Sequence, residues 1–157
     1  MTYFSEVYDC SLITIKDYKL DKLAKEDYDS FLLYLESILI RAIPKFDGCL
    51  NSLEYEYIEE ENENGEIKRV PVFKSDLTIK EKSILADLMI ITWFTSKVQD
   101  VTQFQGSLNT REFKKFSESN NLKQKNIYLM QLKEEFEQEI TDYQNNNLSN
   151  IEFFGDI

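Results

Sequence analysis

The spacing of apolar residues predicts helices over most of the chain. Segment 77–101 is apolar on nearly every side of a helix, which is typical of a helix buried on several sides. Thr78 and Glu81 form a capping box at its start, in which each side chain satisfies a free backbone N–H of the first turn. We therefore expect a buried central helix over 77–101, with Trp93 in the core that it shares with its neighbours.

Two further segments have helical periodicity. In 26–44, apolar residues recur three and four apart from Tyr28 to Ala42, and Pro44 disfavours helix at the residue before it. In 112–145, one apolar stripe runs opposite a charged face, which predicts a long amphipathic helix. We expect this helix to begin between residues 112 and 119 and to end at the run of asparagines 145–147. The polar stretch before it predicts a turn or an extended segment.

Segment 50–74 alternates between apolar and polar residues, as a β-hairpin does. Asn64-Gly65 is the preferred pair for a two-residue type I′ turn. Pro71 cannot donate to a strand ladder, which places the second strand at a sheet edge there. A lone hairpin is marginally stable, so we expect Tyr55, Tyr57 and Val72 to contact helices or another chain. The turn predicts these facing pairs: Tyr57 with Val72, Glu60 with Arg69, and Glu61 with Lys68.

The two ends of the chain are expected to be extended arms. Residues 1–25 mix aromatic and charged residues without a clear period. Residues 148–157 are too apolar to prefer water and follow a polar break, which suggests a docking peptide. Its apolar residues after the break include Ile151, Phe153, Phe154 and Ile157.

These elements predict one domain over 1–157 with a mainly α fold. We expect a small bundle of three to four helices, with the hairpin inserted between the first and the central helix. The low Gly and Pro content, 4 and 2 residues, agrees with long helices rather than an all-β fold.

The formal net charge of −11 restricts which partners the protein can bind. Phosphate neutralisation needs clustered Lys and Arg, so we expect no specific binding to DNA and no attraction to an anionic membrane. No signal peptide and no membrane span is expected from the sequence.

The residues for common site chemistry are missing or scattered. There is no His, which removes the usual general base, Ser-His triads and most zinc sites. Cys10 and Cys49 match no metal or redox spacing and are expected to be reduced thiols in a cytoplasmic product. We therefore expect no enzyme activity, no catalytic residue, no cofactor and no metal.

Two segments in a fixed order resemble a family of small virion proteins of tailed phages. The first runs from Leu77 through Glu81 and Met89 to Trp93. The second contains Phe113, Lys114, Ser117, Asn120 and Leu122 at the start of the last long helix. The chain departs from the family pattern at Asn121, where His is frequent, and at Ser119, where Ala is.

The family is similar to head–tail connector, or neck ring, proteins, including those of crAss-like phages. The resemblance implies a structural subunit of a dodecameric ring in the virion neck, beneath the portal. Its implied partners are the portal and other neck or tail proteins, with DNA passing through the lumen without specific binding. The five named residues of the second segment, together with Ile151, Phe153, Phe154 and Ile157 of the apolar tail, are the candidate interaction residues.

A second interpretation also accounts for the acidity. The chain would then be a small acidic protein that binds a host target, such as an inhibitor that mimics DNA. Gene neighbourhood separates the two, because connector genes lie close to portal and capsid genes.

Overall fold

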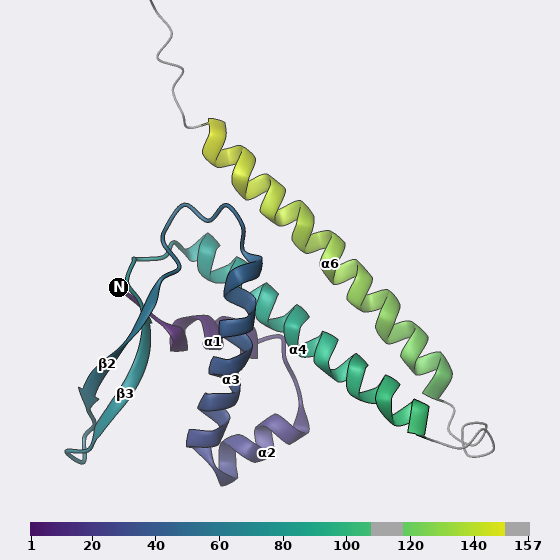
Figure 1. Ribbon diagram of the computed structural model, residues 1–157, viewed down its shortest axis with the longest axis horizontal. Helices are drawn as coiled ribbons and strands as arrows, with labels where there is room; N and C mark the ends of the chain where they lie inside the picture. Colours follow the sequence, from purple (N-terminus) through teal and green to yellow (C-terminus); the bar gives the residue numbers. More distant parts are fainter. Residues whose placement is uncertain (108–117, 150–157) are drawn as a thin grey trace, which may run out of the picture. The chain divides into compact units, whose positions relative to one another are not determined.

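The computed structural model describes the backbone of residues 1–107 and 118–149, and the side-chain surroundings of residues 1–99 and 123–148. The expected mainly α fold with a small hairpin is confirmed. The chain divides into two compact units, Met1–Ile90 and Ile91–Ile157, and the boundary falls within one long helix, α4, Ile79–Ser107 (Figure 1).

The first unit begins with a short strand and two helices. These are β1, Thr2–Tyr3; α1, Phe4–Leu12; and α2, Tyr18–Glu26. The expected extended arm over residues 1–25 is therefore wrong. Phe4, Val7, Tyr8 and Ser11 recur at helical spacing and are all buried, so α1 belongs to the core of its own unit.

The predicted helix over 26–44 is confirmed as α3, Tyr28–Ala42, followed by a 3₁₀ turn, Ile43–Lys45. Asp27 ends α2 and caps α3, since its Oδ1 accepts from the backbone N–H of Ser30 over 3.0 Å. This shared residue places α2 across the start of α3 (Figure 1).

The predicted hairpin is confirmed as β2, Tyr55–Glu61, and β3, Ile67–Phe73, but its register is wrong by one residue. Glu60 faces Lys68, Glu59 faces Arg69, and Tyr57 faces Pro71. The cause is the turn. Asn64 does not have a positive φ, as a type I′ turn would require, whereas Gly65 has φ of 77°. The N–H of Gly65 donates to the carbonyl of Asn62, which gives a longer loop than the sequence predicted.

The sheet has a third strand that the sequence did not predict. β1 pairs antiparallel with β3, giving the order β1-β3-β2. Thr2 faces Phe73 and Tyr3 faces Val72, so β1 covers only the end of β3. Pro71 lies just outside this pairing and therefore at an edge, as expected.

Aromatic packing joins α1 to the sheet. The ring centroids of Phe4 and Phe73 are 4.5 Å apart, and those of Phe4 and Tyr55 are 5.3 Å apart. Leu35 and Leu39 of α3 and Met89 of α4 are also completely buried. These contacts form the hydrophobic core of the first unit.

The start of α4 is fixed by a buried carboxylate. Glu81 is 1% exposed and closes the predicted capping box, since Oε2 accepts from the N–H of Thr78 over 2.7 Å and Thr78 Oγ1 accepts from the N–H of Glu81 over 3.2 Å. Asn51 also donates its Nδ2 to Oε2 over 2.8 Å. One side chain therefore joins the helix to the loop before β2.

In the second unit, the part of α4 from Ile91 onward packs against α6, Glu118–Ser149, and the two run antiparallel (Figure 1). Both helices end later than predicted: α4 continues to Ser107, into the stretch expected to be a turn, and α6 continues through the asparagines to Ser149. Asparagine lowers helix propensity by less than glycine or proline does, so a helix can pass through such a run. The start of α6 lies within the expected range.

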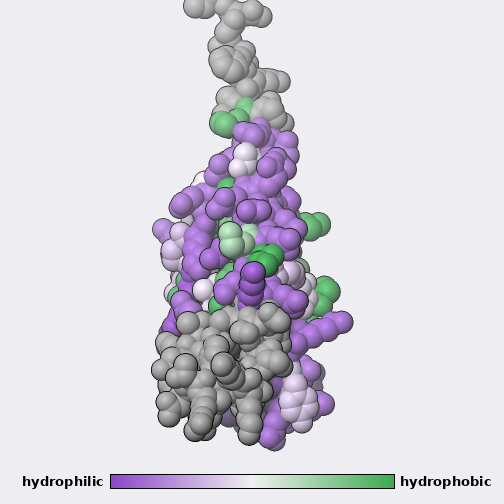
Figure 2. Space-filling view, turned by 90° about the vertical axis from the view of Figure 1, so that its right-hand side faces the viewer, coloured by the Kyte–Doolittle hydropathy of each residue, from purple (hydrophilic) through white to green (hydrophobic). Residues whose placement is uncertain are grey.

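The prediction that Trp93 is buried in the core is wrong, because its side chain is only partly buried. The apolar cluster of this unit is formed by Ile91, Val98 and Leu129, with three partly buried residues packed on it: Phe94, Leu132 and Phe136. Positions 91, 94 and 98 share one face of α4, whereas position 93 points away from that face. The face of the molecule seen in Figure 2 is mainly hydrophilic, with scattered apolar residues.

Candidate functional site

One candidate site in the first unit is a partly enclosed cavity of about 380 Å³, which we call the α1–α3 cavity. It is lined by α1, α3 and β3. Its walls are mainly apolar, and charged side chains stand around them. The lining residues are Phe4, Ser5, Tyr8, Asp29, Leu32, Leu33, Glu36, Lys68, Arg69, Val70 and Pro71.

The buried polar group of this cavity is the hydroxyl of Tyr8. The side chain is 5% exposed, and its oxygen has no hydrogen-bond partner among the described residues. Burial raises the pKa of Tyr8 further above its usual range, and nearby Glu36 acts in the same direction. The hydroxyl is therefore protonated at neutral pH and can donate a hydrogen bond.

The charged groups around the cavity are only partly paired. Lys68 Nζ lies 3.0 Å from Asp29 Oδ1, and both side chains are exposed. The hydroxyl of Tyr57 donates to Glu36, and this bond raises the pKa of Tyr57 to about 12. The guanidinium of Arg69 lies 5.4 Å from the centre of the Tyr57 ring. The cavity therefore combines apolar walls, a buried donor and an accessible cation.

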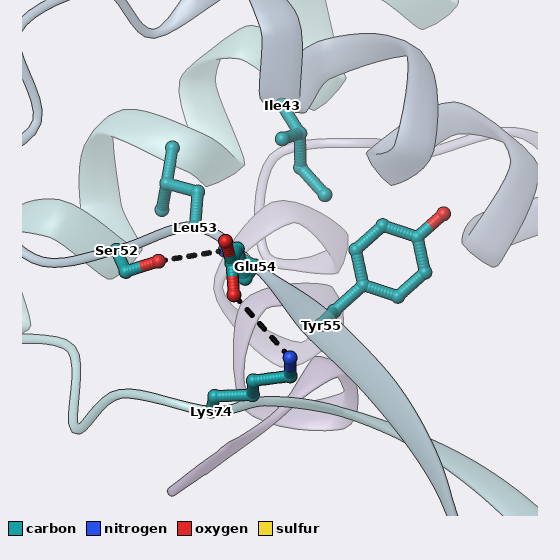
Figure 3. A pocket seen from close by; sticks show the side chains of 6 residues that line it. All are labelled: Ile43, Ser52, Leu53, Glu54, Tyr55 and Lys74. Atoms are coloured by element: carbon teal, nitrogen blue, oxygen red, sulfur yellow. Dashed lines mark hydrogen bonds and ion pairs between the residues drawn. The ribbon is translucent and has the colours of Figure 1, made fainter.

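A second, open hollow of about 610 Å³ lies where the hairpin strands meet the end of α3 (Figure 3). It is lined by Ile43, Ser52, Leu53, Glu54, Tyr55 and Lys74. Glu54 Oε2 lies 3.3 Å from Lys74 Nζ, and the N–H of Glu54 donates to Ser52 Oγ over 3.2 Å. Its two charges neutralise each other, so this hollow suits a surface contact better than a reaction.

The outer edge of the sheet is acidic. β2 pairs with β3 alone, which leaves its other edge without a strand among the described residues. The strand carries Glu56, Glu59, Glu60 and Glu61, and Glu60 also accepts from the hydroxyl of Tyr3 over 2.6 Å. Charged residues on an edge strand discourage unspecific strand pairing. This edge therefore favours a basic partner over another acidic strand.

The three hairpin residues singled out from the sequence are in different surroundings. Val72 is completely buried within its own unit, so it cannot contact another chain in this fold. Tyr55 is partly buried against Phe4, whereas Tyr57 is 41% exposed. Of the three, Tyr57 is the most accessible to a partner.

The other sequence-predicted interaction residues cannot be placed as a site. Asn120 and Leu122 lie in the first turns of α6, with their side-chain surroundings outside the described part of the chain. The remaining ones lie outside the described residues altogether: Phe113, Lys114, Ser117, Ile151, Phe153, Phe154 and Ile157.

Sequence reasoning missed Tyr8 and the cavity around it. The available signal was the spacing of Phe4, Val7 and Tyr8, which predicts one buried helical face. The cavity itself was not predictable, because its walls come from three elements that are distant in sequence.

Within the described residues, no three side chains of His, Cys, Asp or Glu are grouped so that they could bind a metal ion. Nor does any helix in that part of the chain have the length and apolar character needed to cross a membrane. Comparisons of the chain with protein-family models, curated proteins and solved structures find no match.

Proposed function

We propose that this chain is a structural subunit of a ring in the neck of a tailed phage, where it links the portal to the tail. The observation that carries the proposal is the ordered pair of segments, 77–94 and 113–122, which resembles connector proteins. A long helix begins within each segment: α4 begins at Ile79 in the first, and α6 begins at Glu118 in the second. The resemblance expects long helices at these two places, and the described residues contain a helix at each.

The charge of the chain supports this role. A net charge of −11 and an acidic strand β2 repel phosphates, so a lumen built from such subunits would let DNA slide without binding it. The proposal needs no catalytic residue and no cofactor.

Surfaces that have no partner among the described residues support an assembled state. The edge of β2 has no strand beside it among the described residues. On α6, Ile127 and Met130 lie one turn apart and are both substantially exposed. The sequence of 150–157 also contains apolar side chains, whose burial is favourable. A ring would offer each of them a neighbouring subunit or the portal.

The alternative function, an acidic inhibitor of a host protein, is favoured by the same charge. The two proposals differ in where the protein is found. Peptide mass spectrometry of purified particles of the phage that encodes this chain should detect the chain in a constant ratio to the portal protein. A protein that is abundant in infected cells but absent from washed particles would contradict the connector role and favour the inhibitor.

A further inference from the structure

The α1–α3 cavity has the properties of a binding site. Its volume of about 380 Å³ lies within the usual range of ligand pockets. Its apolar wall includes Phe4, Leu32, Leu33, Val70 and Pro71. Leu33 is 64% exposed, so the apolar wall extends to the surface, where an incoming side chain can reach it.

Tyr8 gives an independent indication of an occupant. Its side chain lines the cavity, is 5% exposed, and has a hydroxyl without a partner among the described residues. Buried hydroxyls are normally hydrogen-bonded, because an unpaired one is unfavourable. An occupant with a carbonyl or carboxylate oxygen would satisfy it.

The charged residues indicate the further chemistry of that occupant. Lys68 is already paired with Asp29, and Glu36 accepts from Tyr57. Arg69 stacks near Tyr57 but forms no ion pair with a described residue. An apolar peptide with an acidic residue beside its apolar side chains would therefore match the cavity.

We infer that the cavity binds segment 150–157 of a second copy of this chain. That segment combines the apolar Ile151, Phe153 and Phe154 with the acidic Glu152 and Asp156, and its backbone supplies acceptors for Tyr8. The inference rests on the proposed ring. In a closed ring each subunit uses one surface toward one neighbour and a different surface toward the other. A cavity and a tail on every subunit meet that requirement.

The first test measures binding of a fluorescent peptide of residues 148–157. The receiver is the full chain with Phe153→Asp and Phe154→Asp, which prevents its own tail from competing. We expect saturable binding at micromolar peptide, weakened about fivefold by adding Tyr8→Phe and about tenfold or more by adding Leu33→Asp. The matched controls are Tyr18→Phe and Leu50→Asp, at exposed positions outside the cavity, and they should leave binding unchanged.

Thermal unfolding of Tyr8→Phe separates binding from folding. Because the hydroxyl has no partner among the described residues, its removal should leave the melting temperature of the free protein unchanged or raise it. No peptide binding, or binding that is equally strong in the cavity variants, would overturn the inference.

A mixing experiment tests whether the contact is between copies. A chain with Leu33→Asp keeps its tail, and a chain with Phe153→Asp and Phe154→Asp keeps its cavity. We expect the two to associate one to one on mixing, whereas neither associates alone. If the mixture stays monomeric, the second-copy inference is wrong, while a ring observed for the unmodified chain would still support the proposed function. Association of the mixture without any ring of the unmodified chain would contradict the proposed function instead.

Discussion

Glu81 shows how far a single residue could be predicted. Its capping box with Thr78 follows from local spacing and is confirmed. The hydrogen bond that Asn51 donates to Glu81 was not predictable, because Asn51 lies in a loop distant in sequence. Tyr8 is similar: its helical face can be read from the sequence, but not the cavity that it lines.

Replacing Glu81 should destabilise the first unit. Glu81→Ala removes the acceptor for Thr78 and Asn51 and leaves partly buried donors unpaired, which should reduce the free energy of unfolding by about 1.5–3 kcal/mol. Urea unfolding measures this change. Glu135→Ala, at an exposed position on α6, is the control and should change stability by less than about 0.5 kcal/mol. Equal effects of the two substitutions would show that the buried carboxylate does not hold the helix start.

The contact between Glu6 and Lys82 should make stability depend on pH. Lys82 Nζ donates to Glu6 Oε2 over 2.9 Å, and this bond lowers the pKa of Glu6 below its ordinary value of 4.5. Because the pKa is lower in the folded state, the stabilisation is fully present above pH 4.5 and is lost as pH falls through the lowered pKa.

Urea unfolding of Glu6→Gln from neutral to acidic pH tests this dependence. The pair is partly exposed and screened, so the substitution should cost about 0.2–1 kcal/mol at neutral pH, and the difference should vanish in acid. Glu63→Gln, at an exposed position in the hairpin loop, should show no such trend. A difference that persists unchanged in acid would exclude the ion pair as its cause.

At the scale of elements, periodicity predicted α3, the hairpin and the two long helices. It failed for α1 because the buried positions Phe4, Val7 and Tyr8 are mixed with charged residues over a short segment. It failed for the strand register because Asn64-Gly65 fits more than one turn, and only backbone geometry distinguishes them. Helix ends were also missed, since polar residues did not stop α4 or α6.

The hairpin loop predicts unequal effects of alanine substitution at two adjacent positions. Gly65→Ala should destabilise the protein by about 1 kcal/mol or more, because φ of 77° is strained for any residue with a Cβ. A Cβ would meet Glu61 Oε1 only at 3.6 Å, so the effect comes from the backbone and not from a clash. Asn64→Ala should change stability by less than about 0.5 kcal/mol. Thermal unfolding of both variants distinguishes this loop from a type I′ turn, in which both substitutions would destabilise.

For the whole molecule, composition predicted a folded, acidic, mainly helical chain. It could not predict which surfaces lack a partner, because that depends on which faces the fold leaves open. The edge of β2 and the α1–α3 cavity therefore became candidates only with the structure.

The acidity predicts that the full chain does not bind double-stranded DNA at physiological salt. With a net charge of −11, any association would have to overcome repulsion from phosphates. Fluorescence anisotropy of a labelled duplex should stay constant up to micromolar protein. A rise that disappears with added salt would reveal a basic face and would favour a nucleic-acid role over a passive lumen.

The central claim is that copies of this chain form a ring on the portal. Native mass measurement of the full chain, alone and mixed with the candidate portal protein, tests it most directly. We expect a discrete complex that contains many copies of the chain per portal assembly, with twelve implied by the resemblance. A chain that stays monomeric both alone and with the portal would contradict the account.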